Sequence, residues 1–583
     1  MRKLCMLTCF ALLFALFPFA VLNADQNDHL KKEENSTLFY ITGTVLDPHK
    51  NLVKFARVRL FVNGKLHPII VDNKEAEETE TSSHGSYKLL FKMPRDEINR
   101  SKIEIEVYKS AFEKTLVPVS YEDFCLKDGV CYFSKDITIK RKLNPAFYIA
   151  TTIFVLIYLV ISLELLHRTI AALVGGSLVM LVSYTLGTIN PEYHIMSYET
   201  AIASIDMNVI FLLMGMMIII GVLKHTGVFQ WCAYMSYKIA RGNILALSFI
   251  SCVFIAFTSA FLDNVTTMLL YTPVLMEISL ALRISPLSLL IPGVIASNLG
   301  GTATLIGDPP NIIIGSYTGL TFMQFVYNLA IPVLVSTVLL GFYIRLWYGK
   351  EYRKGKVDDV DAFIAKLKEE YQITDRVLLG YGLIIMAIVI AFFASHGYWH
   401  MEVSIPALFG AAALSVYGLL TKKIKLYELL EKDIEWPTLI FFIFLFILVG
   451  AVDEVGLLSI IADWVLQLSK GNLIFATCLI LWVSAIASAF IDNIPFVATM
   501  LPIVAYLSKS IPGAENNVLW WALALGACFG GNGTLIGASA NVVTMGIAES
   551  KGYRVTFMEF MKIAFPFMVI SVGVCNLWLL LFY

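Results

Sequence analysis

The sequence has 583 residues, of which 57% are hydrophobic and only 15% are charged, and its formal net charge is −1. Soluble domains carry roughly 45–50% apolar and about 25% charged residues, so this composition argues against a soluble enzyme, a disordered scaffold and a nucleic-acid-binding protein. It predicts a polytopic membrane protein instead.

The chain begins with a basic and then apolar segment, residues 1–24. Arg2 and Lys3 stand before an apolar run of about 18 residues, which is long enough for a membrane-spanning helix. A basic start followed by an apolar run is also typical of a secretory signal peptide. A cleaved signal peptide and a retained signal anchor both fit these residues, and the topology derived below favours the anchor.

Residues 25–145 have a different character. They hold 20 of the 44 Lys and Arg residues, and short alternating runs such as ITGTVL, ARVRLFV and SYKLLF recur between turn-rich stretches. Alternation of apolar and polar residues is typical of half-buried strands. We therefore predict a small β-sandwich-like domain outside the cytoplasm. Cys125 and Cys131 lie in it, and we expect a disulfide between them because extracytoplasmic compartments are oxidising.

From residue 146 onward the chain is mostly apolar, and a charged cytoplasmic linker at 346–376 divides it into membrane halves at 146–345 and 377–583. Two apolar stretches, 243–275 and 472–506, carry an Asp-Asn pair near the middle, and we interpret them as re-entrant hairpins. The predicted fold is an all-α polytopic membrane protein of about 11 spanning helices plus these two hairpins, with the first segment counted as a span. The candidate spans after the β domain are 146–164, 169–189, 206–223, 285–315, 324–345, 377–395, 402–420, 436–453, 517–546 and 560–582.

The distribution of basic residues gives the orientation. With this topology, 22 Lys and Arg residues fall in cytoplasmic loops and ends, and after the β domain only Lys470 and Lys509 fall in outer loops. The positive-inside rule predicts such a bias. If either hairpin were a simple span, every later loop would change side and the bias would weaken.

The two membrane halves resemble each other in sequence. Phe-Leu-Asp-Asn at 261–264 recurs as Phe-Ile-Asp-Asn at 490–493, and GGTATLIGDPPN at 300–311 recurs as GGNGTLIGASAN at 530–541. The orientation count places the halves in opposite senses, so we interpret them as inverted repeats, which are typical of secondary transporters.

The Gly- and Pro-rich segments 300–311 and 530–541 cannot be ordinary spanning helices, because Gly and Pro interrupt the helical hydrogen bonds. Broken backbone at membrane depth is tolerated where it is buried or lines a polar cavity. Half-helix N-termini at such breaks favour anions, and freed carbonyl groups favour Na⁺. The alternative is a Gly-rich packing kink, which two matched copies make the weaker interpretation.

Asp263 and Asp492 lie within otherwise apolar stretches, where a carboxylate is costly and is functional by default. Each can hold Na⁺, since hard cations prefer oxygen ligands, or carry a proton. Asn264, Thr266 and Asn493 add neutral oxygen atoms beside them. The alternative is a helix N-cap at each hairpin tip, and the two roles are compatible.

Asp308 breaks the symmetry of the two halves, because Ala538 stands at the matching position. It is interpreted either as a proton site or as a structural cap. Asp206 and Glu435 stand at matched helix starts and are interpreted as boundary caps. Arg168 stands at a cytoplasmic helix end, where interface anchoring is favoured over substrate contact.

The segments FLDNVTTMLLYTP and SNLGGTATLIGDPPNIII resemble the ion-transporter superfamily, which includes arsenite permeases, sodium/proton antiporters and divalent-anion/sodium symporters. The sequence LLHRT at 165–169 adds a resemblance to the group of the melanosomal P protein and its bacterial relatives. The resemblance covers 146–583 and implies an elevator-type carrier, usually dimeric. The superfamily's dicarboxylate symporters carry Ser-Asn-Thr at both hairpin tips, whereas Asp-Asn-Val and Asp-Asn-Ile stand here, which favours a cation or a proton over a dicarboxylate at the tips.

The resemblance implies that hairpin tips and broken helices form the substrate- and ion-binding site, with Na⁺ expected at the two Asp-Asn pairs. The expected site residues are Asp263, Asn264, Thr266, Asn298, Gly301, Thr302, Thr304, Gly307, Asp308, Asn311, Asp492, Asn493, Gly531, Asn532, Thr534, Gly537 and Asn541.

We therefore expect an ion-coupled secondary active transporter in a plasma (inner) or organelle membrane, moving Na⁺ or H⁺ and, as a further cargo, a small anion. A Na⁺-coupled dicarboxylate, citrate or arsenite transporter is the alternative. An intramembrane protease and a ligand sensor are remote, since the chain lacks Gly-x-Gly-Asp, His-Glu-x-x-His and Gly-x-Ser-x-Gly motifs. We expect no enzymatic activity, no cofactor beyond the coupling ion and no nucleic-acid partner; the expected partners are the lipid bilayer and a second copy of the chain.

Overall fold

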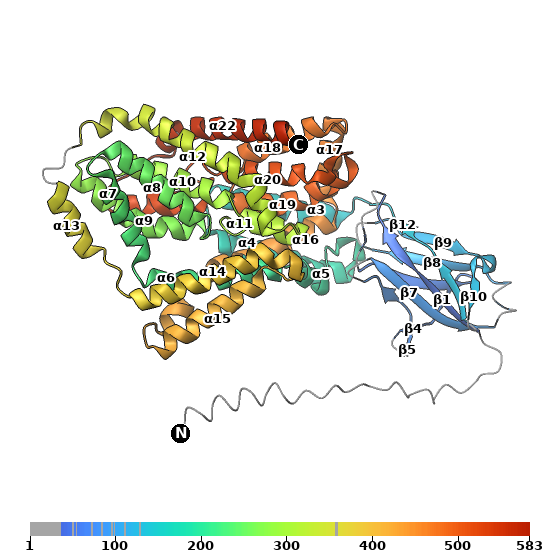
Figure 1. The fold of residues 1–583 in the computed structure, drawn as a ribbon. Helices are drawn as coiled ribbons and strands as arrows, with labels where there is room; N and C mark the ends of the chain where they lie inside the picture. Colours follow the sequence, from blue (N-terminus) through green and yellow to red (C-terminus); the bar gives the residue numbers. More distant parts are fainter. Residues whose placement is uncertain are drawn as a thin grey trace, which may run out of the picture. The chain divides into compact units, whose positions relative to one another are not determined.

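The computed structural model describes residues 37–583 apart from short gaps at 49–51, 54, 72–73, 83–84, 95–96, 98–99, 110–111, 128–129 and 356–359. The predicted signal segment at residues 1–24 lies outside the described residues. The described chain divides into two compact units, one of strands up to residue 140 and one of helices from residue 141, to which Phe112 also belongs (Figure 1).

Strands make up the N-terminal unit. They are β1 (Thr37–Leu46), β2 (Arg57–Val62), β3 (Lys65–His67), β4 (Ile69–Val71), β5 (Lys74–Ala76), β6 (Thr79–Glu80), β7 (Ser86–Met93), β8 (Ile103–Tyr108), β9 (Thr115–Val119), β10 (Cys125–Lys127), β11 (Val130–Ser134) and β12 (Ile137–Thr138). One five-stranded sheet is built around β1, which pairs in parallel with β11 and β12 and antiparallel with β7; a second is built around β2 and β8. Alternate residues such as Phe39 and Ile41 in β1 and Val58 and Leu60 in β2 are fully buried, as expected when each sheet has one apolar face.

The predicted disulfide between Cys125 and Cys131 is wrong, because both residues are free thiols. In the antiparallel pair β10 and β11, Cys125 lies opposite Tyr132 and Leu126 lies opposite Cys131. The two cysteines are therefore offset by one position, and successive side chains of a strand point to opposite faces. Cys131 is buried and Cys125 is exposed, so their sulfur atoms lie on different faces of the sheet.

Helices make up the second unit. They are α3 (Pro145–Ser162), α4 (Arg168–Ile189), α5 (Tyr198–Ala203), α6 (Met207–Lys224), α7 (Val228–Ala240), α8 (Ile244–Ser259), α9 (Asn264–Ala281), α10 (Leu287–Thr302), α11 (Pro309–Thr318), α12 (Phe322–Tyr352), α13 (Val360–Glu370), α14 (Arg376–Trp399), α15 (Ser404–Leu420), α16 (Trp436–Glu454), α17 (Leu457–Ser469), α18 (Leu473–Phe490), α19 (Asn493–Ser510), α20 (Val518–Gly530), α21 (Ser539–Ser550) and α22 (Phe557–Phe582). Local sequence sets their starts: Thr321 with Gln324 and Thr556 with Glu559 form matching capping boxes at α12 and α22.

Eight of the described helices are long and apolar enough to cross a membrane, namely α3, α4, α6, α12, α14, α16, α18 and α22. Large apolar side chains such as Phe342 and Leu346 are exposed on them, as lipid contact requires. The prediction of a mostly helical multi-pass membrane protein with an N-terminal β region is therefore confirmed. The full number of spans and the inverted sense of the two halves remain predictions.

Two apolar stretches that were candidate single spans, 285–315 and 517–546, are interrupted in the middle. α10 ends at Thr302 and α11 begins at Pro309, while α20 ends at Gly530 and α21 begins at Ser539. The breaks fall within the Gly-rich motifs, as those motifs predict. Each Asp-Asn pair likewise stands at a helix junction, between α8 and α9 and between α18 and α19.

The short helices α7 and α17 are additional elements that the apolar pattern alone did not predict. α7 follows Gly227 and α17 follows Gly456, and both glycines have positive φ angles, 75° and 91°. Glycine adopts this backbone conformation at the lowest steric cost, which accounts for the recurrence of glycine at these two positions. The halves also pack together: α12 and α22 lie side by side (Figure 1), where the Tyr343 hydroxyl donates to the Ile563 carbonyl oxygen at 2.7 Å.

Candidate ion-binding site

Both hairpin tips are capped by their aspartates. Asp263 precedes α9 and its Oδ1 accepts the backbone N–H of Thr266 at 2.9 Å. Asp492 precedes α19 and its Oδ1 accepts the backbone N–H of Ile494 at 3.1 Å. The N-cap interpretation is thus confirmed for both residues. Capping occupies one carboxylate oxygen of each, so the second oxygen remains for another partner.

The broken helices lie in direct backbone contact with the hairpins. A Cβ atom on Gly300 would stand 2.1 Å from the carbonyl oxygen of Ala256 in α8, and one on Gly530 would stand 2.4 Å from that of Ala485 in α18. Glycine is therefore required at both positions, because no other residue permits this approach. This close approach places each Gly-rich segment in contact with the C-terminal part of a hairpin helix, α8 or α18.

Matched threonines and asparagines hold the two breaks. The Thr304 hydroxyl donates to the carbonyl oxygen of Ala260 at the end of α8. The Thr534 hydroxyl donates to that of Ala489 at the end of α18. The Asn311 side chain donates to the carbonyl oxygens of Thr302 and Thr304 at 3.0 and 2.8 Å. Asn541 does the same for two carbonyl oxygens of the second break at 2.8 and 2.9 Å. Carbonyl groups freed by the breaks thus already accept amide hydrogen bonds.

Side chains from both halves meet in a buried cluster, which we call the central amide cluster: Asn264, Asn298, Asp308, Asn493, Asn532 and Asn541. Asn298 stands at its middle. Its Nδ2 donates to Asn532 Oδ1 at 3.0 Å and to Asn541 Oδ1 at 3.1 Å, and its Oδ1 accepts from Asn264 at 3.0 Å. All members are at least 96% buried. Polar groups at such depth are stable only when they are hydrogen-bonded or hold a ligand.

Asp308 is the acidic member of the cluster. It occupies the N-cap position of α11 but makes no side-chain cap hydrogen bond, so its interpretation as a structural cap is wrong. Its Oδ1 instead faces both tips and accepts from Asn264 and Asn493, each at 3.4 Å. Its Oδ2 is buried without a hydrogen-bond partner, as is Nδ2 of Asn532. Among the ion pairs of the described residues, none involves Asp308.

Arg168 is a functional candidate that the sequence interpretation placed outside the site. Its Nη1 lies 3.0 Å from Asp492 Oδ2 and also contacts the Ser539 hydroxyl, which donates to the same Asp492 oxygen at 2.8 Å. The guanidinium stands over the Phe441 ring, 5.3 Å from its centre. A usable signal was present in the sequence: carboxylates within apolar segments need a countercharge, and Arg168 is a basic residue at the start of an apolar helix.

The other predicted site residues have packing or hydrogen-bonding roles. A Cβ on Gly301 would stand 2.6 Å from the carbonyl oxygen of Gly307, so these glycines permit the fold of the first break. Of the two matched acidic residues, Asp206 caps α6 through the backbone N–H of Val209 at 3.2 Å, as predicted. The cap prediction is wrong for Glu435, whose side chain accepts from the Thr438 hydroxyl instead. The remaining predicted residues line the breaks or tips: Thr266, Thr302, Gly531 and Gly537.

The described part of the chain contains no group of three or more His, Cys, Asp and Glu side chains arranged to hold a metal ion. Any Na⁺ would therefore depend on amide and hydroxyl oxygens together with fewer than three carboxylates. These are ligands that hard cations accept.

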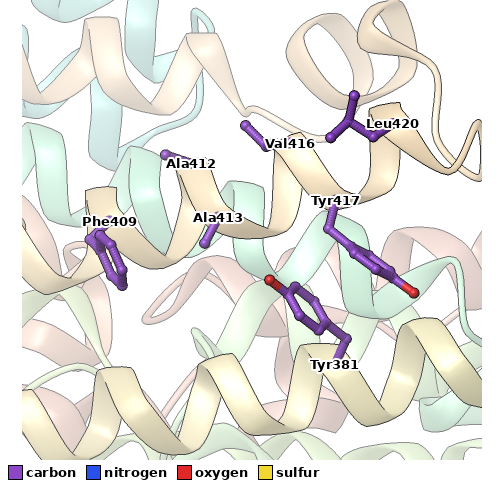
Figure 2. A pocket seen from close by; sticks show the side chains of 7 residues that line it. All are labelled: Tyr381, Phe409, Ala412, Ala413, Val416, Tyr417 and Leu420. Atoms are coloured by element: carbon purple, nitrogen blue, oxygen red, sulfur yellow. The ribbon is translucent and has the colours of Figure 1, made fainter. Parts of the chain in front are cut away.

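A groove of about 370 Å³ lies elsewhere, on α14 and α15 (Figure 2). Tyr381 and Tyr417 stack there with ring centres 4.1 Å apart. Its other lining residues are Phe409, Ala412, Ala413, Val416 and Leu420. None of the predicted site residues lines it, so the groove is separate from the central amide cluster.

Comparisons with known proteins agree with a transporter. The CitMHS family, described as citrate transporter, matches residues 158–526. The uncharacterized transporter Mb2703 of Mycobacterium bovis is 42% identical over 437 residues, which cover 75% of this chain and 98% of that protein. The human P protein is 35% identical over 506 residues, covering 74% of this chain and 59% of the P protein. The crystal structure of the Alcanivorax borkumensis YdaH transporter is similar with a TM-score of 0.50 at 15% identity, covering 71% of this chain and 98% of that one. At that identity the likeness concerns the fold alone.

Proposed function

The chain belongs to the CitMHS citrate transporter family, a family of membrane transporters, and on that basis we propose that it is an ion-coupled secondary active transporter. The coupling ion is Na⁺ or H⁺, bound between the two hairpin tips and the two broken helices. A small anion is the further cargo. The chain acts as a carrier and not as an enzyme.

The central amide cluster is the observation that carries this proposal. It gathers side chains from both halves around one carboxylate, and it leaves a buried acceptor on Asp308 and a buried donor on Asn532 without partners. Buried polar atoms without partners are rare, and each calls for an explanation such as an ion or a water. A cation beside the Asp308 carboxylate satisfies both the charge and the unpaired oxygen.

The anion follows from the two helix breaks. α11 and α21 both begin at a break inside the helical unit, and the N-terminus of a helix favours negative charge. The family's name supports citrate as the first anion to examine. The Asp-Asn tips, which differ from the dicarboxylate pattern, make arsenite and chloride necessary comparisons.

An elevator mechanism is the expected movement. The hairpins and broken helices would move together as the transport part, because Gly300 and Gly530 join them backbone to backbone. A homodimer would anchor the stationary part. The matched order of hairpin, broken helix and capped long helix in the two halves supports inverted repeats.

A flux screen tests the proposal. The full chain is reconstituted into liposomes, and uptake of Na⁺, H⁺, chloride, arsenite, citrate and other dicarboxylates is measured under imposed Na⁺ or pH gradients. We expect uptake of at least one of these solutes to follow the Na⁺ or the H⁺ gradient. Uptake that is independent of both gradients, or the absence of uptake for every solute, would overturn ion-coupled transport.

A further inference from the structure

The two hairpin tips differ in their electrostatic environment although their sequences match. At the second tip, both carboxylate oxygens of Asp492 are engaged: Oδ1 accepts from the Ile494 backbone, and Oδ2 lies against Arg168 and accepts from Ser539. The side chains of Arg168 and Asp492 are only 24% and 12% exposed. A charge-assisted pair in such partial burial is stronger than an exposed surface pair.

At the first tip, Arg168 acts on Asp263 only at longer range than an ion pair. Asp263 accepts from the Thr266 backbone at 2.9 Å, and among the ion pairs of the described residues none includes Asp263. Four carboxylates, Asp263, Asp308, Glu435 and Asp492, therefore share this region with the Arg168 guanidinium, which forms an ion pair with Asp492. Among the ion pairs of the described residues, none neutralises Asp263 or Asp308.

Arg168 reaches the second tip from outside the hairpin. It is the first residue of α4, and the neighbouring helix α3 makes a further contact, because the Tyr158 hydroxyl lies 2.8 Å from the Pro495 carbonyl oxygen and 2.6 Å from the Thr499 hydroxyl of α19. The second hairpin is thus held to α3 and α4 at two points. A separate element supplies the positive charge at its tip.

We propose that Arg168 is the built-in counter-ion of the second hairpin tip: its guanidinium occupies the place of a coupling cation at Asp492, so that an external cation binds at the first tip only. Arg168 is a positioning residue in this scheme, since it acts through Asp492. The inference rests on the proposed function and assigns the cation to Asp263, Asn264 and Asp308. It replaces the expectation of equivalent Na⁺ sites at the two Asp-Asn pairs.

The proposal also bears on the asymmetry at Asp308. The first half has an extra carboxylate there, where the second half has Ala538, and the first half also supplies Arg168. Asp308 faces both tips at 3.4 Å, whereas Arg168 pairs with the second tip. An arginine cannot lose its charge under physiological conditions, so the second tip carries a permanent countercharge.

Equilibrium binding of radioactive Na⁺ to the purified full-length protein tests the proposal. In the otherwise unaltered chain, Asp263→Asn is expected to abolish binding, whereas Asp492→Asn is expected to weaken it, because Arg168 then faces the site without its counter-ion. Arg168→Gln is expected to raise bound Na⁺ about twofold at saturation, because a second carboxylate becomes free to ligate a hard cation. The double variant with Asp492→Asn should lose this gain, and Arg168→Lys should restore the original binding.

Arg345→Gln is the matched control, since Arg345 is an exposed arginine of α12, and Na⁺ binding should not change. Unaltered Na⁺ binding by a folded Arg168→Gln variant would overturn the proposal. So would equal losses from Asp263→Asn and Asp492→Asn, an outcome that needs no Arg168 variant to fold. Binding is measured without any flux. If the expected binding pattern holds in a protein that fails the flux screen, the counter-ion assignment stands and the proposed transport function falls.

Discussion

Asn298 donates a hydrogen bond to Asn532 at 3.0 Å and thereby joins two fully buried side chains that lie 234 residues apart in the sequence. The same amide group donates to Asn541 at 3.1 Å. The first break of the helical unit is thus tied to the second through one side chain. A substitution at Asn298 consequently affects both halves.

Asn298→Ala is expected to destabilise the protein and impair transport together. It leaves the buried side-chain oxygens of Asn532 and Asn541 without their donor, at a cost of about 1–3 kcal/mol for each group that stays unsatisfied. Thermal unfolding of the purified protein measures the loss. Ser395→Ala is the control, because this hydroxyl bonds carbonyl groups of its own helix; equal melting temperatures of the two variants would contradict the bridging role.

Gly300→Ala and Gly530→Ala should both be poorly tolerated. The added methyl groups would stand 2.1 and 2.4 Å from backbone carbonyl oxygens, and overpacking typically costs about 1–3 kcal/mol, or more where backbone must move. We expect lower yield of folded protein and lower flux for both. Gly573→Ala in α22 has nothing within 4 Å of its new Cβ and should behave as the unsubstituted protein. Normal flux of the first two variants would show that hairpins and broken helices do not need this contact.

Asp308→Asn removes the negative charge of this side chain while nearly preserving its shape, and so tests whether the charge is needed for transport. The substitution keeps the size of the side chain and its ability to accept from Asn264 and Asn493, so the fold should persist. Ion-coupled flux should fall about tenfold or more, which corresponds to about 1.4 kcal/mol or more of lost interaction with the cation. Flux in liposomes and the melting temperature are measured on the same preparation. A variant with full flux would exclude Asp308 from the ion site.

Asp136 in the β unit should give a pH-dependent contact. Hydrogen bonds from the Thr44 hydroxyl and then from its backbone N–H hold the pKa of Asp136 below its ordinary value of 3.8. Because the folded-state pKa is the lower one, the contribution to stability is present above the unfolded-state pKa and is lost as the pH falls through the folded-state pKa.

Hydrogen exchange of the Thr44 amide in the full chain measures this contact. Protection should decline as the pH is lowered from about 5 to about 3, and Asp136→Ala should remove the pH dependence. The Ile139 amide, which donates to the Leu46 carbonyl oxygen, provides an internal control and should stay protected. If both amides respond alike, the whole sheet opens and the effect does not belong to Asp136.

The parts of the fold that depend on local chemistry could be predicted from the sequence. The length of each apolar run predicted the long helices, and the clustered glycines before Asp308 and Ala538 predicted the breaks. Both features determine the backbone conformation of their own segment. Glycine occurs at matching positions of the two halves, Gly227 and Gly456, and the positive φ angle at both positions explains why. The helices that follow these glycines were not predicted.

Contacts between distant segments could not be predicted in the same way. The register of β10 and β11 places Cys125 and Cys131 on different faces of the sheet. The number of residues between the two cysteines does not determine that register. Nothing in the sequence near Arg168 specifies Asp492 as its partner. For Asp308 the sequence left two roles open, and the side-chain geometry removed the cap.

The central claim is that the hairpin tips and broken helices together form the site that binds and moves a coupling ion, and coupled flux in liposomes tests it most directly. Asp263→Asn and Asp492→Asn remove one negative charge each, while asparagine still caps a helix, so the fold should survive. We predict that each substitution abolishes ion-coupled flux, the first by removing a cation ligand and the second by leaving Arg168 without its counter-ion. Undiminished coupled flux in both folded variants would contradict the account.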